Sequence, residues 1–233
     1  MLFRSWRKEI LTKQKLIKTK VLICLGPGCL AGGSDLILKE FQTILKKKKI
    51  KDVAVESVKK TGCHGFCARG PMVIIEPLGI FYSKVKKIHV KDIIEKTLQK
   101  GEIIEKLLYK DPDTEKIYKE WRQIPFYARQ QKIALRNVGQ IDPDEITDYI
   151  ANGGYAALAK ILKGMKPEEV VEQVSKSGLR GRGGAGFAAG RKWVTCAKAE
   201  ENPHYVLCNG DEGDPGAFMD RCIMEGEIGR AHV

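Results

Sequence analysis

The sequence predicts an α/β protein: a small N-terminal domain followed by the beginning of a second, glycine-rich domain. Three observations support this prediction. Short apolar strands alternate with helical patterns over residues 20–110. Four of the seven cysteines fall in two pairs within that stretch. A glycine-rich stretch and an acidic glycine loop follow at residues 177–190 and 209–216. The 233 residues have room for one large or two small domains, and 43% hydrophobic residues are typical of a globular protein.

The elements of the first domain follow from apolar runs and the turn residues between them. Residues 20–24 (KVLIC) predict a buried strand, which a glycine-rich loop ends. Ser34 is placed to cap the next helix, whose apolar residues recur at helical spacing as far as Leu45. The remaining predicted elements are three strands and a helix, at residues 53–58, 72–75, 80–82 and 90–98.

The second part of the chain begins with a predicted helical connector. Its last helix has Pro167 in the first turn and two glutamates at the positive end of the helix dipole. A further strand is predicted immediately before the acidic loop, because an apolar run ends there. The predicted elements are helices at residues 144–150, 155–162, 167–175 and 191–199, and a strand at residues 205–208.

Positive charge is concentrated in the first half of the chain. Residues 1–110 hold 24 of the 41 Lys/Arg and 10 of the 29 Asp/Glu, while the net charge of the whole chain is +12. This basic half has no recognised nucleic-acid motif and few aromatic residues among its lysines, so we expect no nucleic-acid partner. A solvated surface, or contact with an acidic partner protein, explains the charge better.

The sequence predicts a cytoplasmic protein without direct membrane insertion. No apolar run approaches the roughly 18 residues that a membrane-spanning helix needs. Residues 1–19 are basic but lack the apolar core and cleavage site of a signal peptide. In a reducing compartment, clustered cysteines indicate metal binding rather than disulfide bonds.

Two cysteine pairs carry the strongest chemical signal. Cys24 and Cys29 form one pair, and Cys63 and Cys67 form the other. Both pairs follow predicted strands, so one sheet can bring them together, and neighbouring glycines let backbone amides approach the sulfurs. Four thiolates are what a [2Fe–2S] cluster requires, two for each iron. Structural zinc is the alternative, although zinc favours more closely spaced pairs.

The other residues with metal-binding side chains lack a paired spacing. A Rieske cluster requires two histidines, so His64 is interpreted as a loop residue and not as a ligand. Cys196, Cys208 and Cys222 are expected to be small buried residues.

Two loops of the second domain indicate ligand binding. Residues 181–186 (GRGGAG) fit G-x-G-x-x-G, but a helix and not a strand is predicted before them, which disfavours an ordinary Rossmann fold. Such a loop still lets backbone amides approach a flavin or a phosphate. The acidic loop follows a predicted strand, where α/β proteins bind ligands, and its carboxylates suit sugar hydroxyls. The alternatives are a flexible linker for the first loop, and calcium or a plain acidic turn for the second.

The sequence around the second cysteine pair, TGCHGFCARGPMVIIEPLGIFYSKV, resembles the thioredoxin-like [2Fe–2S] ferredoxin domain. This domain is found at the front of hydrogenase flavoprotein subunits and as a separate small subunit of respiratory complex I. The similarity covers about residues 20–110. It implies that the cluster ligands are Cys24, Cys29, Cys63 and Cys67.

The stretches KSGLRGRGGAGF with RKW, and YVLCNGDEGDPGAFMDR, resemble the FMN- and NADH-binding domain of the complex I flavoprotein subunit. The second stretch is most similar to the beta (flavoprotein) subunits of NAD(P)-linked iron-only hydrogenases and related formate dehydrogenases. The resemblance implies that Phe187 stacks on the adenine of the nucleotide, and that Glu212 and Asp214 line the NADH pocket. It also implies that FMN is contacted by Gly181, Arg182, Gly183, Gly184, Lys192, Asn209 and Asp211.

The implied activity is that of an NAD(P)H dehydrogenase subunit. Hydride would pass from NADH or NADPH to FMN, and single electrons would pass from there to iron–sulfur clusters. The implied partners are the other iron–sulfur subunits of a hydrogenase, formate dehydrogenase or NADH dehydrogenase complex, and a [4Fe–4S] cluster is implied beyond this chain. The residues alone leave two alternatives, a non-enzymatic [2Fe–2S] electron carrier with a docking tail and a zinc-dependent assembly protein.

The chain is predicted to be a C-terminally truncated piece. The last seven residues, EIGRAHV, are a translation of the start of a common sequencing adaptor, so the native sequence is expected to stop near Gly226. With its flavin domain incomplete, the chain alone is expected to be inactive. The predicted segments are a basic segment (1–19), the cluster domain (20–110), a helical connector that starts the flavoprotein domain (111–176), the FMN/NADH-binding loops (177–226) and a non-native tail (227–233).

Overall fold

The computed structural model describes residues 2–48, 50, 57–182, 184–205 and 207–226. The chain forms two compact units. The first contains residues 1–152 and 210–228, and the second consists mainly of residues 153–209. No helix in the described part is long and apolar enough to cross a membrane.

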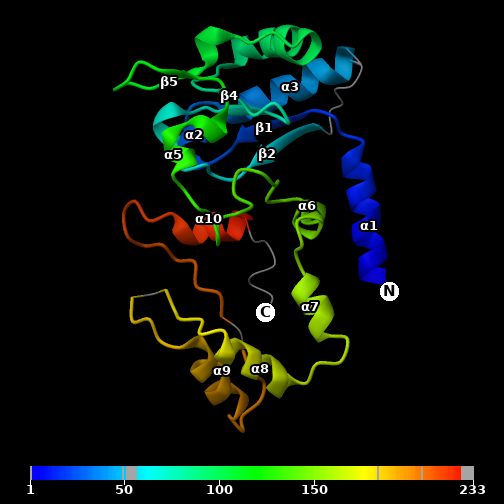
Figure 1. Ribbon diagram of the computed structural model, residues 1–233, viewed down its shortest axis with the longest axis vertical. Helices are drawn as coiled ribbons and strands as arrows, with labels where there is room; N and C mark the ends of the chain where they lie inside the picture. Colours follow the sequence, from blue (N-terminus) through cyan, green and yellow to red (C-terminus); the bar gives the residue numbers. More distant parts are fainter. Residues whose placement is uncertain (1, 49, 51–56, 183, 206, 227–233) are drawn as a thin grey trace. The chain divides into compact units, whose positions relative to one another are not determined.

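A four-stranded mixed sheet forms the centre of the first unit (Figure 1). Its strands are β1 (Lys20–Cys24), β2 (Val58–Thr61), β3 (Val73–Glu76) and β4 (Ile80–Tyr82), in the spatial order β2-β1-β3-β4. β1 is parallel to β2 and antiparallel to β3. Because β1 and β2 run in the same direction, the loops that follow them leave the sheet at the same edge.

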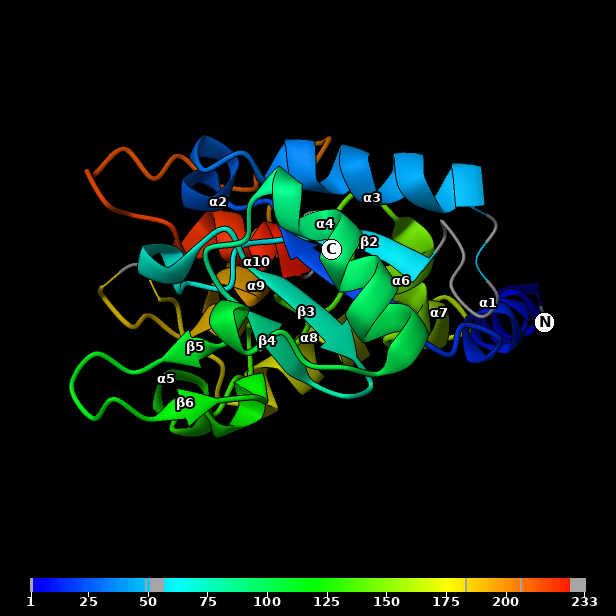
Figure 2. The same cartoon turned by 90° about the horizontal axis from the view of Figure 1, so that it is seen from above.

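The alternation of side chains along β1 separates two hydrophobic cores. Val21 and Ile23 pack with Phe41 of α3 (Ser34–Lys48) on one face. Leu22 lies on the other face, among aromatic residues from later in the chain such as Phe81. Figure 2 shows α3 running beside the helix that begins as α4 (Val90–Asp92), and these two helices are in contact.

Most of the predicted elements of this unit are confirmed. The strands at 20–24 and 80–82 have the predicted bounds, and β3 begins one residue later than predicted. The predicted helix at 90–98 is present, but Ile93–Leu98 is wound as a π-helix. Of the strand predicted at 53–58, residues 53–56 lie outside the described residues, and β2 begins at Val58.

The predicted cap of α3 is wrong. Ser34 is the first residue of α3, and it is fully buried. Its hydroxyl has no hydrogen-bond partner among the described residues. The first turn is instead closed on the preceding glycine, because the amides of Leu36 and Ile37 donate to the carbonyl of Gly33 at 3.1 and 3.3 Å.

Several elements of this unit were not predicted. Residues 2–15, within the stretch predicted only as a basic segment, form helix α1 (Leu2–Lys15). Arg7 on α1 donates to the carbonyl of Ile150 at 3.2 Å, in α6 (Ile146–Ala151). A hairpin joins β5 (Tyr109–Lys110) to β6 (Ile117–Tyr118), and residues 219–226 form α10 (Met219–Gly226).

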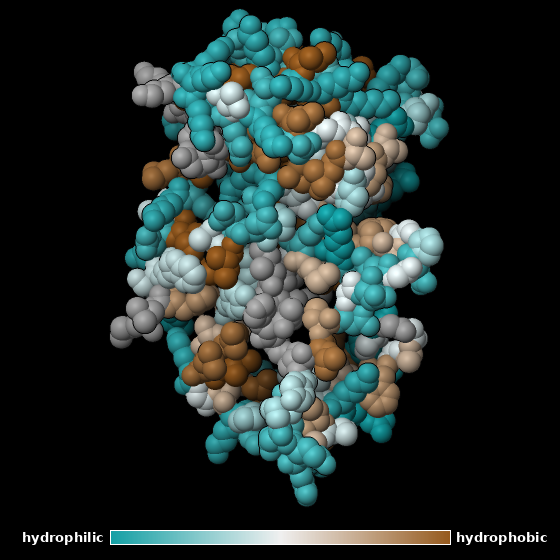
Figure 3. Space-filling view, turned by 180° about the vertical axis from the view of Figure 1, so that it is seen from behind, coloured by the Kyte–Doolittle hydropathy of each residue, from teal (hydrophilic) through white to brown (hydrophobic). Residues whose placement is uncertain are grey.

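Short helices complete the first unit. Residues 121–123 form a 3-10 turn, and α5 (Pro125–Ala128) follows it. On the face seen in Figure 3, hydrophilic residues dominate the upper part, where Figure 1 labels α3. The remaining helices are α2 (Pro27–Ala31), α5 (Pro125–Ala128) and the 3-10 turns Cys67–Arg69, Lys87–His89, Glu105–Leu107 and Trp121–Gln123.

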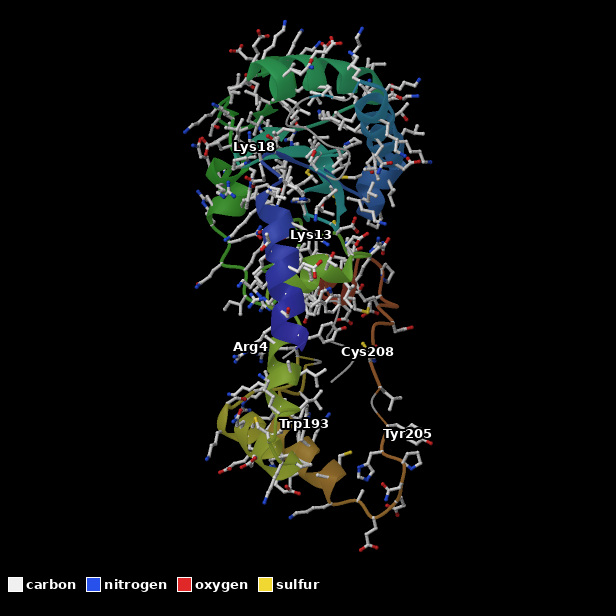
Figure 4. All side chains as sticks on the ribbon, turned by 90° about the vertical axis from the view of Figure 1, so that its right-hand side faces the viewer. Arg4, Lys13, Lys18, Trp193, Tyr205 and Cys208 are labelled. Carbon is white, nitrogen blue, oxygen red and sulfur yellow. The ribbon has the colours of Figure 1, made fainter. Side chains whose placement is uncertain are left out.

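The second unit consists of helices and loops. Its helices are α7 (Ala156–Ile161), α8 (Pro167–Lys176) and α9 (Ala189–Ala197), close to the predicted bounds. α8 and α9 pack tightly, because a Cβ on Gly190 would lie 2.5 Å from the Cα of Ser175. The strand predicted at 205–208 is wrong for the described residues 205, 207 and 208. Figure 4 shows Tyr205 and Cys208 on an extended segment of the chain. An extended segment becomes a strand only when it pairs with a neighbouring strand.

Candidate functional site

The first cysteine pair lies where β1 ends. Cys24 is the last residue of β1, and its amide donates to the carbonyl of Met72 at 3.3 Å. The next amide, that of Leu25, donates to the carbonyl of Thr61 at 3.0 Å. These bonds to both neighbouring strands fix the position of Cys24. Cys29 follows one turn later in α2, and both cysteines are 1% exposed.

The second pair lies in the loop that follows β2. The Sγ atoms of Cys63 and Cys67 are 3.9 Å apart. The amide of Gly65 donates to the Cys63 sulfur at 3.4 Å, and the loop turns at Gly65 with a φ of +79°. Cys63 is buried, whereas Cys67 is exposed at the start of a 3-10 turn. Cys67 is therefore the more accessible residue of this pair.

Glycines interlock the two pairs. A Cβ on Gly26 would lie 2.7 Å from the Cβ of Cys63, and one on Gly28 would lie 3.1 Å from the Cβ of Cys67. In the opposite direction, a Cβ on Gly70 would lie 2.6 Å from the Sγ of Cys29. Each loop thus carries glycine where the cysteines of the other loop approach its backbone. All four predicted ligands are brought together by this packing.

The electrostatics show that the thiols interact with one another. The pKa of Cys24 is raised, chiefly by the thiols of Cys29 and Cys63. The pKa of Cys63 is lowered, chiefly by the thiol of Cys222 and then by that of Cys24. Cys67 has a raised pKa because of partial burial and the charge of Cys63. Thiols that share protons in this way release them when a metal centre binds.

The donor set fits a dinuclear iron–sulfur cluster. Four cysteines in two pairs supply two thiolates for each iron, and the glycines leave backbone close to the sulfurs. In the described residues, no group of three or more His, Cys, Asp and Glu side chains is already arranged to hold a metal ion.

His64 lies between the two cysteines of the second pair in sequence, but its ring contacts residues other than these cysteines. Its ring is buried, and Nε2 is 3.3 Å from the hydroxyl of Thr61. Gly139, with a φ of +79°, packs directly against the ring. Burial and the charge of Lys132 lower the pKa of His64 to about 4. The neutral ring of His64 is therefore packed against Thr61 and Gly139 within the protein.

Sequence reasoning missed the contact between Cys222 and Cys63. Cys222 was expected only to be a small buried residue, and it is 3% exposed. It lies in α10 and forms a small buried cluster with Cys63 and Val138. The available signal was the spacing of Cys222 and Glu225, which places both on one side of a helix. Cys196 and Cys208 are exposed, so the prediction of burial is wrong for these two.

The glycine motif forms a loop closed at its base. An isolated bridge pairs Arg180 with Ala188, and the amide of Gly181 donates to the carbonyl of Phe187 at 2.8 Å. Gly184 has a φ of +103° and so requires glycine. The loop thus contains the predicted residues Gly181, Arg182, Gly184 and Phe187, while Gly183 lies outside the described residues.

A pocket of about 300 Å³ lies beside this loop in the second unit. Phe187 lines it and is 45% exposed. The cations of Arg191 and Lys192 lie 5.5 and 5.7 Å from the centre of the Phe187 ring. An aromatic ring with two cations suits a planar ligand that carries negative charge.

The acidic loop is divided between the units. Asn209 belongs to the second unit, and Asp211, Glu212 and Asp214 belong to the first. Glu212 has a φ of +48°, and its carboxylate accepts the amides of Asp220 and Arg221 at 2.6 and 3.2 Å. In this structure Glu212 therefore caps the start of α10.

Two family models match the chain. Residues 9–98 match the thioredoxin-like [2Fe–2S] ferredoxin, and residues 174–230 match the Nuo51 FMN-binding domain. The predicted resemblance to both domains is confirmed, as is the prediction of an α/β chain with a thioredoxin-like ferredoxin domain. The two matches also support the predicted [2Fe–2S] and FMN cofactors.

Curated relatives are similar to part of the chain. The NADP-reducing hydrogenase subunit HndC of Solidesulfovibrio fructosivorans is 54% identical over 99 residues, which are 42% of this chain and 20% of that protein. An NADH-quinone oxidoreductase subunit of Rhizobium meliloti is 52% identical over 95 residues, 41% of this chain and 23% of that protein. The chain spans about a fifth of the length of these relatives.

Solved structures are also similar to part of the chain. A thioredoxin-like [2Fe–2S] ferredoxin from Aquifex aeolicus is 30% identical, with a TM-score of 0.36 over 38% of this chain and 93% of that one. A second structure of a thioredoxin-like [2Fe–2S] ferredoxin from Aquifex aeolicus is 27% identical, with a TM-score of 0.37 over 43% of this chain and 97% of that one.

Proposed function

We propose that this chain belongs to an electron-transfer flavoprotein subunit that oxidises NADH or NADPH with FMN and a [2Fe–2S] cluster. FMN, when bound, converts a two-electron hydride donor into a source of single electrons that iron–sulfur clusters accept. The observation that carries the proposal is the interlocking of two cysteine loops in one chain with an FMN-binding domain sequence. The names of the relatives, NADH-quinone oxidoreductase and NADP-reducing hydrogenase subunits, support the same reaction class.

The roles of the chain's own residues follow from their placement. Cys24, Cys29, Cys63 and Cys67 would hold the cluster. Phe187 would stack on the adenine of the nucleotide, and Lys192, whose ammonium lies 5.7 Å from the centre of the Phe187 ring, would contact FMN. The backbone amides of the loop around Gly184 would approach the flavin or its phosphate.

The remaining assignments complete the proposed FMN and nucleotide sites. Asp214 and Glu212 would line the nucleotide pocket, and Glu212 would give up its helix cap to do so. Gly181, Arg182, Gly183, Asn209 and Asp211 would complete the FMN site.

The proposed setting is a cytoplasmic multi-subunit complex. The partners would be the other iron–sulfur subunits of a hydrogenase, a formate dehydrogenase or an NADH dehydrogenase. The exposed residue Cys67 marks the side of the cluster that such a partner would approach.

The test is to reconstitute the chain with iron and sulfide, and then with FMN. We expect cluster absorbance with two irons per chain, and a bound flavin once the complete domain is present. Cys24→Ala should lose the cluster, whereas Cys196→Ala, a matched change of an exposed cysteine, should keep it. Zinc in place of iron would refute the cluster assignment. A cluster with no flavin in the longer protein would favour the non-enzymatic electron carrier.

A further inference from the structure

A fifth thiol lies beside the four proposed ligands. Cys222 is buried in α10 and packs with Cys63, Val138 and the partly buried Leu135. Of the four proposed ligands, Cys63 is the one that belongs to this buried cluster. The contact joins residues separated by more than half of the chain, and it lies within the first unit.

Polar contacts on the same face of α10 hold Cys222 in this position. One helical turn further on, the Glu225 carboxylate accepts the amide of Cys63 at 3.0 Å. Arg221 donates to the other oxygen of that carboxylate at 2.7 Å. The loop of the second cysteine pair is thus hydrogen-bonded to α10 through the backbone amide of Cys63.

The end of α10 is fixed independently of the cysteines. Asn137 donates through Nδ2 to the carbonyl of Gly226 at 3.1 Å. A Cβ on Gly226 would lie 2.8 Å from the Cγ2 of Val138, so the helix approaches this segment very closely. Cys222 therefore does not depend on its contact with Cys63 to stay in place.

We propose that Cys222 is a reserve ligand of the [2Fe–2S] cluster, able to replace Cys63 on the same iron. Four thiolates already satisfy the two irons, so a fifth is needed only when Cys63 is absent or detached. In the exchange, the iron–sulfur bond to Cys63 breaks and one to Cys222 forms. The proton released by the Cys222 thiol passes to the Cys63 thiolate, and no electron is transferred. The inference rests on the proposed assignment of the cluster to Cys24, Cys29, Cys63 and Cys67.

The test uses the full chain with alanine at Cys63, because alanine cannot bind iron. Four proteins are reconstituted side by side: the unsubstituted chain, Cys63→Ala, Cys63→Ala/Cys222→Ala and Cys63→Ala/Cys196→Ala. Iron per chain, visible absorbance and the electron paramagnetic resonance spectrum after reduction are measured. We expect Cys63→Ala and its Cys196 control to keep most of their iron. The Cys222 double variant should hold about tenfold less, the size of loss usual when a metal site is disrupted.

Equal loss in Cys63→Ala and in the Cys222 double variant would overturn the proposal, as would equal retention. If the unsubstituted chain itself takes up no cluster, the proposed function fails and the reserve ligand with it. Circular dichroism shows whether each variant is folded. If Cys63→Ala is not, the same comparison is made with Cys63→Gly, which likewise offers no ligand atom to iron. The exchange would be supported directly if the paramagnetic resonance spectrum of Cys63→Ala differs from that of the unsubstituted chain. The altered signal should then be absent from Cys63→Ala/Cys222→Ala.

Discussion

Gly26 and Cys63 approach each other so closely that a single added carbon would not fit between them. A Cβ on Gly26 would lie 2.7 Å from the Cβ and 2.9 Å from the Sγ of Cys63. Gly26 belongs to the loop of the first cysteine pair, and Cys63 begins the second. The contact therefore sets how closely the two halves of the cluster site meet.

Gly26→Ala should weaken the cluster site more than Gly28→Ala. The first substitution forces the backbone of one loop away from Cys63, at a cost of about 1–3 kcal/mol for overpacking. The second meets Cys67 at 3.1 Å, where a smaller shift is enough. The measurement is cluster content after reconstitution and the midpoint of urea unfolding. Equal behaviour of the two variants would show that the contact at Cys63 does not control the site.

Asp148→Asn should destabilise the first unit strongly. The Asp148 carboxylate is buried and pairs with Lys59 of β2, whose side chain is only 15% exposed. It also accepts Gln14 Nε2 at 3.0 Å and the amide of Asp142 at 3.1 Å. Loss of the charge leaves the ammonium of Lys59 buried without its anion, which costs about 3–5 kcal/mol.

The matched control is Asp35→Asn, which breaks an exposed pair with Lys39 in α3. An exposed pair contributes about 0–1 kcal/mol, so this variant should unfold near the wild-type urea concentration. A loss of stability in Asp148→Asn no larger than in the control would contradict the role given to the buried pair.

The stability of the chain should depend on Lys60 at high pH. The Asp144 carboxylate is the main cause that raises the pKa of Lys60 above its ordinary value of 10.5. A raised pKa of a base means that the folded state holds the proton more tightly, so this contribution is complete below pH 10.5 and is lost as the pH rises through the folded pKa. The unfolding free energies of the wild type and Asp144→Asn should therefore converge once the pH exceeds the pKa that Lys60 has in the folded state. A difference that stays constant from neutral to alkaline pH would exclude the linkage.

Phe187→Ala should weaken nucleotide binding in a protein that contains the complete flavin domain. Stacking of a base on an aromatic ring contributes about 1–3 kcal/mol, so the dissociation constant for NADH should rise about tenfold or more. Phe126→Ala, a change of an exposed phenylalanine of the first unit that lies outside the FMN/NADH-binding loops, is the control. Calorimetric titration with NADH distinguishes the two. An unchanged affinity in Phe187→Ala would remove the ring from the nucleotide site.

Local signals in the sequence were enough for much of the fold. The apolar run at Lys20–Cys24 and the turn before Ile80–Tyr82 define two strands, and the structure has both with the predicted bounds. Pro167 and the glutamates after it mark the start of α8 correctly. These elements succeed because their own residues contain both the periodicity and the boundary.

The errors share a different physical origin. Residues 205–208 have the composition of a strand, but a strand forms only where a neighbouring strand offers its hydrogen bonds. Ser34 has a good capping side chain, yet burial at the start of α3 leaves its hydroxyl without a partner among the described residues. The contact between Cys63 and Cys222 depends on tertiary packing across most of the chain, which no local pattern contains.

Cys67 differs from its three companions in being open to solvent, and this makes it a natural reporter for the cluster. A thiolate bound to iron is protected from alkylating reagents, whereas a free exposed thiol reacts readily. Cys196 and Cys208 are also exposed and give a constant background of labelling. The extent of labelling above that background would count the chains whose cluster is missing, without any spectroscopic measurement. Because Cys67 is exposed to solvent, oxidants reach it first, and oxidative damage to the cluster is expected to begin at Cys67.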